Sequence, residues 1–156
     1  MTRVWTIAIA LCIGAFGVYG CDEEETPEDK LTDDLDVFED EQNEQVDVVC
    51  DCWQEFTYGQ NAVQYPNKDA CKTGQGEILP ARRRCIDDAF QQDVSVSQQW
   101  LDCVLPLERE YTDCINSKLT CMDATSISAC DSDYNTGYDR CLTLPNSVQR
   151  DYEDCF

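Results

Sequence analysis

The stretch VSQQWLDCVLPLEREYTDCI, residues 96–115, decides the fold class. Its apolar side chains recur every three or four residues, as one face of an α-helix requires; they are Val96, Trp100, Cys103, Leu107, Tyr111, Cys114 and Ile115. Similar series precede and follow it: Val46, Val49, Trp53 and Phe56, then Tyr134, Tyr138, Cys141, Leu142, Val148, Tyr152 and Cys155. No stretch of comparable length alternates with the two-residue period of a strand. We therefore predict an all-α domain with most of these aromatic side chains in its core.

The dipeptide Leu-Pro occurs three times, each time between two cysteines, at Leu79-Pro80, Leu105-Pro106 and Leu144-Pro145. Proline suits the first turn of a helix and pushes the preceding residue out of the helical region. We expect each Leu-Pro to start a short helix, which gives about four or five helices. Because the apolar periodicity runs across Pro106 without a break, a single kinked helix is the alternative there.

The chain has 12 cysteines in 156 residues. Such a composition is typical of a disulfide scaffold in an oxidising compartment. Ten cysteines lie in residues 45–156, and we predict that they form five disulfides: Cys50, Cys52, Cys71, Cys85, Cys103, Cys114, Cys121, Cys130, Cys141 and Cys155. Ten cysteines allow on the order of a thousand pairings, among which the sequence does not choose.

Helical geometry restricts some of these pairings. Cys103 and Cys114 would be about 16 Å apart in one straight helix, which is too far for a bridge. They can pair with each other only if the chain folds back at Pro106; otherwise each is joined to a different helix. Cys50 and Cys52 are two residues apart and point to different sides of a helix, so we expect them to bridge to separate partners.

The N-terminus has the organisation of an export signal. Arg3 precedes an apolar run of roughly 16 residues, which is short for a membrane-spanning helix and typical of a signal peptide. The run ends in Val18-Tyr19-Gly20-Cys21. This motif resembles the lipobox of bacterial lipoproteins, in which the cysteine receives diacylglycerol; Val18, Gly20 and Cys21 match, whereas Tyr19 is bulkier than usual. The resemblance implies cleavage before Cys21 and lipidation of Cys21.

Two alternatives to lipidation are cleavage by ordinary signal peptidase, which would release a soluble protein, and retention of the N-terminal helix. Cysteine parity favours the lipoprotein, because ten cysteines remain once Cys12 leaves with the signal peptide and Cys21 carries lipid. We expect a lipid-anchored protein of the cell envelope that faces the periplasm or the exterior. The cysteine-rich part is similar in composition to uncharacterised envelope lipoproteins.

Residues 22–44 contain thirteen Asp and Glu and a single Lys. A segment with so few apolar residues cannot bury enough surface to offset the entropy of ordering, and its charges repel one another. We therefore predict three parts: a signal peptide at 1–20, a lipidated N-terminus and disordered acidic linker at 21–44, and the cysteine-rich helical domain at 45–156.

Composition excludes several functional classes. The formal net charge is −21, which argues against binding to nucleic acid, and the chain has no histidine. Without histidine there are no Ser-His or Cys-His nucleophile pairs and no imidazole metal ligands. The cationic cluster Arg82-Arg83-Arg84 spreads around a helix and is expected to pair with the domain's own carboxylates, of which Asp87 and Asp88 are nearest in sequence.

The segment 131–139 resembles the front half of an EF-hand loop, with oxygen-bearing side chains at Asp131, Asp133, Asn135 and Asp139. It departs from that pattern because glycine falls at position seven and Leu142 stands where a bidentate glutamate is needed. We therefore predict no metal site here and favour a polar turn that caps the next helix; calcium binding by these four residues is the alternative.

From these features we expect no cofactor and no catalytic residues. The sequence favours a non-enzymatic, membrane-anchored binding module whose partner is a protein or a glycan. A calcium-binding module and a hydrolase that uses only carboxylates are the alternatives.

Overall fold

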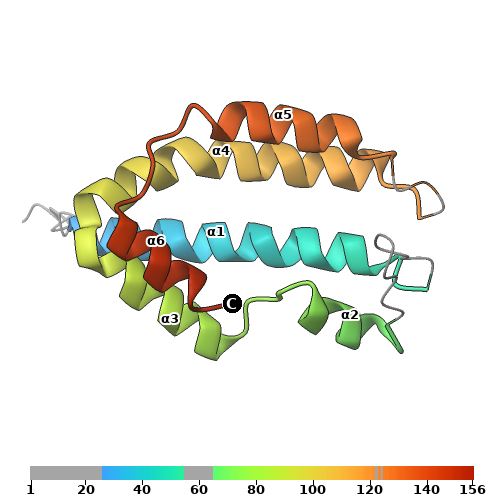
Figure 1. Cartoon of the computed structure of the whole chain (residues 1–156), viewed down its shortest axis with the longest axis horizontal. Coiled ribbons are helices and arrows are strands. Elements are labelled where there is room, and N and C mark those ends of the chain that lie inside the picture. Colours follow the sequence, from blue (N-terminus) through green and yellow to red (C-terminus); the bar gives the residue numbers. More distant parts are fainter. Residues whose placement is uncertain (1–25, 55–64, 122, 124) are drawn as a thin grey trace, which may run out of the picture.

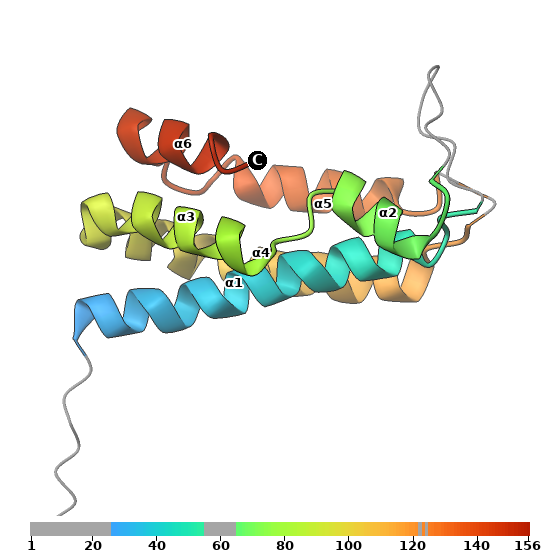
Figure 2. The ribbon, with the colours of Figure 1, turned by 90° about the horizontal axis from the view of Figure 1, so that it is seen from below.

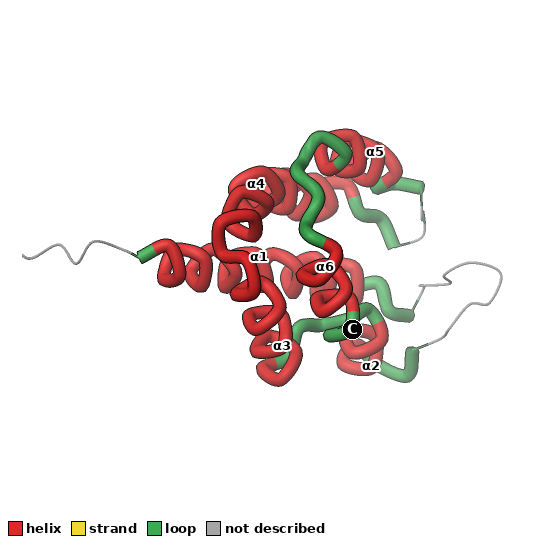
Figure 3. The backbone as a smooth tube through the Cα atoms, turned by 60° about the vertical axis from the view of Figure 1, so that its left-hand side comes forward, coloured by secondary structure: helices red, strands yellow, loops and turns green. Residues whose placement is uncertain are grey.

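The computed structural model describes residues 26–54, 65–121, 123 and 125–156, so the predicted signal peptide and Cys21 lie outside the described residues. Within those ranges the chain forms six α-helices, one short 3₁₀ helix and no β-strand (Figures 1 and 3). The helices are α1 (Pro27–Cys50), α2 (Lys68–Gly74), α3 (Pro80–Phe90), α4 (Val94–Lys118), α5 (Ser128–Tyr138) and α6 (Asn146–Glu153). The all-α, disulfide-linked fold predicted from the sequence is confirmed. None of the helices in these ranges is both long and apolar enough to cross a membrane.

The described part of the acidic segment is helical and not a disordered linker, which corrects the predicted boundary of the domain. Residues 27–44 form most of α1, which begins with a capping box between Thr26 and Asp29 and has Pro27 in its first turn. Leu31, Leu35 and Phe38 recur at steps of four and three and are buried. The neighbouring helices supply the rest of the apolar surface, so three large side chains suffice to order the segment, and of its acidic residues only Glu39 is buried.

Helices α1 and α4 lie side by side and run in the same direction (Figures 1 and 2). Helix α3 returns along α1, and α5 returns along α4. Helix α6 packs on α3 and is linked to it by the disulfide between Cys85 and Cys155. The core fills the space between these elements and includes Phe38, Phe90, Trp100, Leu101, Val104, Leu144 and Val148.

Helix α4 continues through Pro106, so the prediction of two short helices at this point is wrong and the single-helix alternative is correct. The other two Leu-Pro dipeptides do stand at helix starts, because Pro80 is the first residue of α3 and Pro145 is the N-cap of α6. Pro106 is tolerated inside α4 because it lies on the exposed face, where water can hydrogen-bond the carbonyl that the proline leaves unpaired.

Replacing Pro106 with alanine should therefore stabilise the protein. Alanine restores the missing backbone donor, and we expect the free energy of unfolding to rise by about 1–2 kcal/mol, since proline costs about 3 kcal/mol in an ideal helix and gives part of this back by restricting the unfolded chain. Urea unfolding followed by circular dichroism measures the change. Pro80→Ala is the matched control, because the amide of a first helical residue has no partner in the helix; its effect should stay within about 0.5 kcal/mol. A loss of stability in Pro106→Ala would contradict this account of α4.

Five disulfides join the helices: Cys50–Cys71, Cys52–Cys121, Cys85–Cys155, Cys103–Cys141 and Cys114–Cys130. Cys50 and Cys52 have separate partners, as their spacing predicts. Cys103 and Cys114 sit in one continuous helix and are joined to different segments, as the single-helix alternative requires. All ten cysteines that were predicted to form disulfides do so.

Arg83 is the centre of a charge cluster between α1 and α3. Its guanidinium lies 2.8 Å from a carboxylate oxygen of Asp36, 2.6 Å from Glu39 and 2.8 Å from Asp40. The Arg82-Arg83-Arg84 cluster was expected to pair with the domain's own carboxylates, of which Asp87 and Asp88 are nearest in sequence; Arg83 does pair with carboxylates, but with those of α1. The side chain of Arg83 extends from α3 toward α1. The acidic residues that it meets, Asp36, Glu39 and Asp40, lie within about one turn of each other on α1. Arg82 instead donates to the carbonyls of Cys155 and Glu77.

Glu39 is the buried member of this cluster, with 0% of its side chain exposed. Burial raises the pKa of Glu39 from 4.5 to about 7, and the positive charge of Arg83 only partly opposes that rise. The folded protein therefore binds more protons than the unfolded chain between these two values. The stability that this residue contributes is complete below about pH 4.5 and is lost as the pH rises through about 7.

We expect Glu39→Gln to remove this dependence. Relative to the variant, the wild type should lose up to about 3 kcal/mol of unfolding free energy between pH 4.5 and pH 8. Denaturant unfolding at a series of pH values measures the difference between the two curves. Glu110→Gln changes an exposed residue of α4, so its plot of unfolding free energy against pH should match that of the wild type. Parallel plots for Glu39→Gln and the wild type would contradict the raised pKa of Glu39.

Candidate binding cleft

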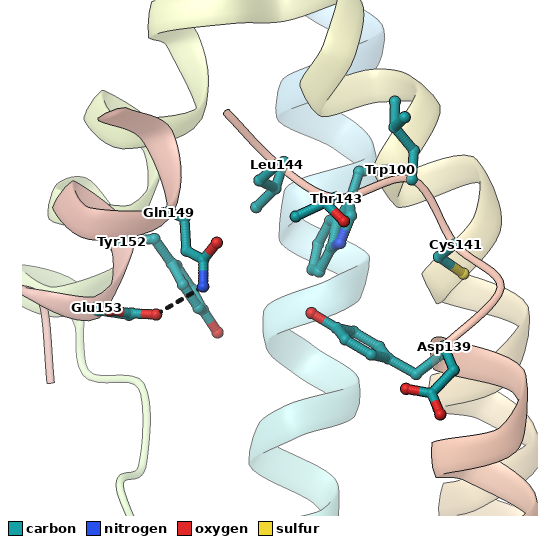
Figure 4. Close-up of a pocket in the computed structure, with 10 residues that line it drawn as sticks. Trp100, Asp139, Cys141, Thr143, Leu144, Gln149, Tyr152 and Glu153 are labelled. Carbon is teal, nitrogen blue, oxygen red and sulfur yellow. Dashed lines mark hydrogen bonds between the residues drawn. The ribbon is translucent and has the colours of Figure 1, made fainter. Parts of the chain in front are cut away.

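A candidate site is a cleft of about 290 Å³ where α4, the end of α5, the segment 139–145 and α6 meet (Figure 4). We call it the aromatic cleft. Ten residues line it: Trp100, Tyr138, Asp139, Cys141, Leu142, Thr143, Leu144, Gln149, Tyr152 and Glu153. Its volume is close to the lower end of the range that holds small-molecule ligands.

A disulfide and a proline hold the segment that forms one wall. Cys141, three residues beyond the end of α5, is bonded to Cys103 of α4, with 5.7 Å between their Cα atoms. Leu144 is buried against the core, and Pro145 then starts α6. The segment is thereby fixed on both sides of Leu142, whose side chain is left 48% exposed at the cleft.

Aromatic rings form the floor and part of the walls. Trp100 is buried, and its ring meets the Tyr138 ring edge-on with 6.3 Å between centroids. Phe90 lies under the cleft and contacts both Trp100, at 5.4 Å, and Tyr152, at 5.5 Å. The rings therefore belong to one continuous packed cluster that reaches from α3 to α5. This apolar surface is already rigid, so binding a ligand to it would cost little conformational entropy of the protein.

Close packing of α5 on α4 holds Tyr138 in place. Gly137 has no side chain, and a Cβ at this position would lie 2.6 Å from a methyl group of Leu107. The glycine therefore allows the end of α5 to approach α4 closely. Tyr138 remains 41% exposed, which is high for a large aromatic residue, and stacks on Tyr134 one turn earlier.

The rim of the aromatic cleft is acidic. Figure 4 shows Asp139 and Glu153 on opposite sides of the opening, with Gln149 beside Glu153. Gln149 donates a hydrogen bond of 2.9 Å to a carboxylate oxygen of Glu153. None of the ten residues that line the cleft is a lysine or an arginine. The surface is therefore suited to a ligand with an apolar part and a positive charge.

The groups in the aromatic cleft can hold a ligand through hydrogen bonds. The sulfur of Cys141 is held in a disulfide. Burial and the nearby charge of Glu108 raise the pKa of Tyr152, so its hydroxyl stays protonated and can act as a hydrogen-bond donor. The polar atoms that remain belong to amide, hydroxyl and carboxylate groups, all of which can hydrogen-bond a ligand.

A second, more open cleft of about 380 Å³ lies between α1, α4 and α5. It is lined by Gln42, Gln45, Glu108, Tyr111, Asp131, Tyr134 and Asn135. Glu108 is buried, and burial raises its pKa although hydrogen bonds to its charged form oppose the rise. One of its oxygens accepts from the Tyr134 hydroxyl at 2.6 Å, and the other accepts from the Gln45 amide at 2.7 Å. Both oxygens thus join the three helices, so we interpret Glu108 as a structural group.

The segment 131–139 belongs to α5 and its C-cap, so the polar turn predicted there is wrong, and the alternative of a calcium loop does not fit either. Asp131, Asp133 and Asn135 belong to α5, and Asp139 is its C-cap. Successive helical residues rotate by about 100°, so Asp133 points away from Asp131 and Asn135. Asp131 instead accepts a hydrogen bond of 2.9 Å from the Tyr111 hydroxyl. Across the described part of the chain, no three His, Cys, Asp or Glu residues are grouped so that they could hold a metal ion.

Sequence reasoning identified the aromatic residues of the cleft but assigned them to the core. That assignment is correct for Trp100 and incomplete for Tyr138, which is both packed and exposed. Asp139 was singled out as a metal ligand, and Glu153 was not singled out. The sequence carried no signal for Leu142, because the apolar periodicity places it on the same helical face as Tyr138 and Cys141, whereas the structure places it between α5 and α6.

Comparison with protein-family models, with curated protein sequences and with solved structures finds no match to this chain. The case for a function therefore depends on the residues of the site.

Proposed function

We propose that the protein is a membrane-anchored lipoprotein of the bacterial cell envelope that binds a partner protein through the aromatic cleft and catalyses no reaction. The observation that carries the binding role is the pair of exposed apolar side chains, Tyr138 and Leu142, beside two rim carboxylates. Exposed apolar residues with a polar rim are characteristic of interaction sites.

The size of the aromatic cleft favours a protein partner over a glycan. Its volume of about 290 Å³ suits one long side chain, and Trp100 is too deeply buried to offer its face to a sugar ring. A protein partner would insert one side chain as an anchor and cover Leu142 and Tyr138 with the residues around it. A rigid cleft that receives one anchor residue is a common arrangement at the centre of protein interfaces.

The anchoring part of the proposal rests on Val18-Tyr19-Gly20-Cys21 and the apolar run before it. Mass spectrometry of the protein from a membrane fraction tests it. We expect a mature chain that begins at Cys21 and carries diacylglycerol on its sulfur, and a Cys21→Ser variant that is not acylated. A mature N-terminus at another residue, without lipid, would refute the anchor.

Photo-crosslinking in cells tests the binding role. A benzoylphenylalanine at position 142 should form adducts with a defined partner protein, and Tyr138→Ala should weaken them. Position 79 is the matched control, because Leu79 is an apolar residue of similar exposure, 51%, outside the aromatic cleft. Adducts of equal yield at both positions, or none at position 142, would refute the proposed role of the cleft.

A further inference from the structure

We infer that the aromatic cleft receives an arginine side chain, so that the partner is a protein segment with an exposed arginine. This inference rests on the proposed binding role of the cleft and names the chemistry of the occupant. Three features of the cleft support it: its charge, its rings and its shape.

The charge of the cleft selects a cation. Asp139 and Glu153 stand on opposite sides of the opening, and the lining residues include no lysine or arginine that would neutralise them (Figure 4). The Asp139 carboxylate has no hydrogen bond or ion pair to any other side chain of the described residues, so it is available to a ligand. The whole chain has a net charge of −21, which would steer a basic partner toward it.

The rings and the shape select arginine among the cations. A guanidinium is planar, stacks on aromatic rings and donates hydrogen bonds in two directions at once, whereas an ammonium is a compact and strongly hydrated charge. Donors in two directions suit an opening that has a carboxylate on each of two opposite sides (Figure 4). The protein itself shows the same chemistry nearby, where the Arg82 guanidinium lies 4.8 Å from the centre of the Phe156 ring.

The test compares two short glycine-serine peptides, one with a central arginine and one with citrulline, which has the same shape and no charge. Binding to the ¹⁵N-labelled domain is measured by NMR titration at about 0.15 M salt, where long-range attraction by the acidic surface is screened. We expect the arginine peptide to bind about tenfold more tightly, since cation–π contacts and charge-assisted hydrogen bonds each contribute.

Two charge-matched double variants locate the effect. Asp139→Asn with Glu153→Gln should reduce the preference for arginine to less than about twofold. Asp33→Asn with Asp113→Asn removes the same charge from exposed positions on α1 and α4, and the preference should persist. All four positions are exposed, and circular dichroism verifies that each variant is folded.

Equal affinity for the arginine and citrulline peptides would overturn the inference, as would loss of the preference in both double variants. Binding of a neutral oligosaccharide such as cellotriose in the cleft, without binding of the arginine peptide, would also overturn it. The crosslinking experiment tests the proposed binding role independently of this inference. Specific crosslinks from position 142 without an arginine preference would leave the binding role intact and refute only the choice of arginine.

Discussion

Arg83→Met should lower the free energy of unfolding by about 3–5 kcal/mol at pH 8. The substitution leaves Glu39 fully buried beside Asp36 and Asp40, without the cation that lies 2.6 Å from it. The loss should shrink at pH 5, because the pKa of about 7 keeps Glu39 protonated there and a neutral carboxyl group needs no counter-ion. Urea unfolding at the two pH values, with the disulfides intact, measures both losses.

Two further variants separate the buried ion pair from the general effect of charge. Arg84→Met removes a neighbouring arginine that is exposed, and it should cost less than about 1 kcal/mol at either pH. Adding Glu39→Gln to Arg83→Met removes the unpaired charge and should restore most of the stability. Equal losses for Arg83→Met at pH 5 and pH 8 would contradict the role assigned to Glu39.

Phe38→Ala should cost about 3–5 kcal/mol, because Phe38 is buried and truncation leaves a cavity that the helices around it cannot fill completely. Its ring packs edge-on against Trp100, with 5.5 Å between centroids, so the substitution should also loosen the tryptophan under the aromatic cleft. Urea unfolding followed by circular dichroism gives the stability, and tryptophan fluorescence of the folded variant reports the change in packing.

Asp33→Ala is the control for Phe38→Ala, since Asp33 is an exposed residue of the same helix and its loss should change the stability by less than about 0.5 kcal/mol. Similar small effects for both substitutions would mean that residues 27–44 contribute nothing to the core, as a linker would.

The acidic helix shows where composition misleads. Thirteen acidic residues in 23 positions predict a disordered linker, and that prediction is wrong for residues 27–44, which belong to α1. Order depends on where the few apolar residues stand: Leu31, Leu35 and Phe38 share one face of α1, and Phe38 meets Trp100 of α4. The long sequence separation hides this contact, because a charge count over a window considers only neighbours along the chain.

In residues 96–115, the periodicity of the apolar residues predicted the structure more reliably than composition did in the acidic segment. The steps of three and four in residues 96–115 predict a helix correctly and continue across Pro106, where the proline was given too much weight. Cys50 and Cys52 bridge to different partners, as helical geometry requires. The identity of those partners, Cys71 and Cys121, depends on how the helices pack, which spacing alone does not encode.

The aromatic cleft was beyond sequence reasoning for a related reason. Trp100, Tyr138 and Tyr152 come from three helices, and the periodic pattern places each of them on an apolar face. Only the packing of the helices reveals that these apolar faces leave the aromatic cleft open between the end of α5 and the start of α6. In contrast, the oxygen-rich segment 131–139 looked like a site because its residues are close in sequence, but helical geometry directs them apart.

The central claim, that a partner's side chain enters the aromatic cleft, is tested most directly by NMR of the complex with the arginine peptide. Intermolecular nuclear Overhauser effects from the arginine methylene protons to the rings of Tyr138 and Tyr152 are the result we predict. Contacts confined to the acidic surface of α1, with unchanged signals from both tyrosine rings, would contradict it.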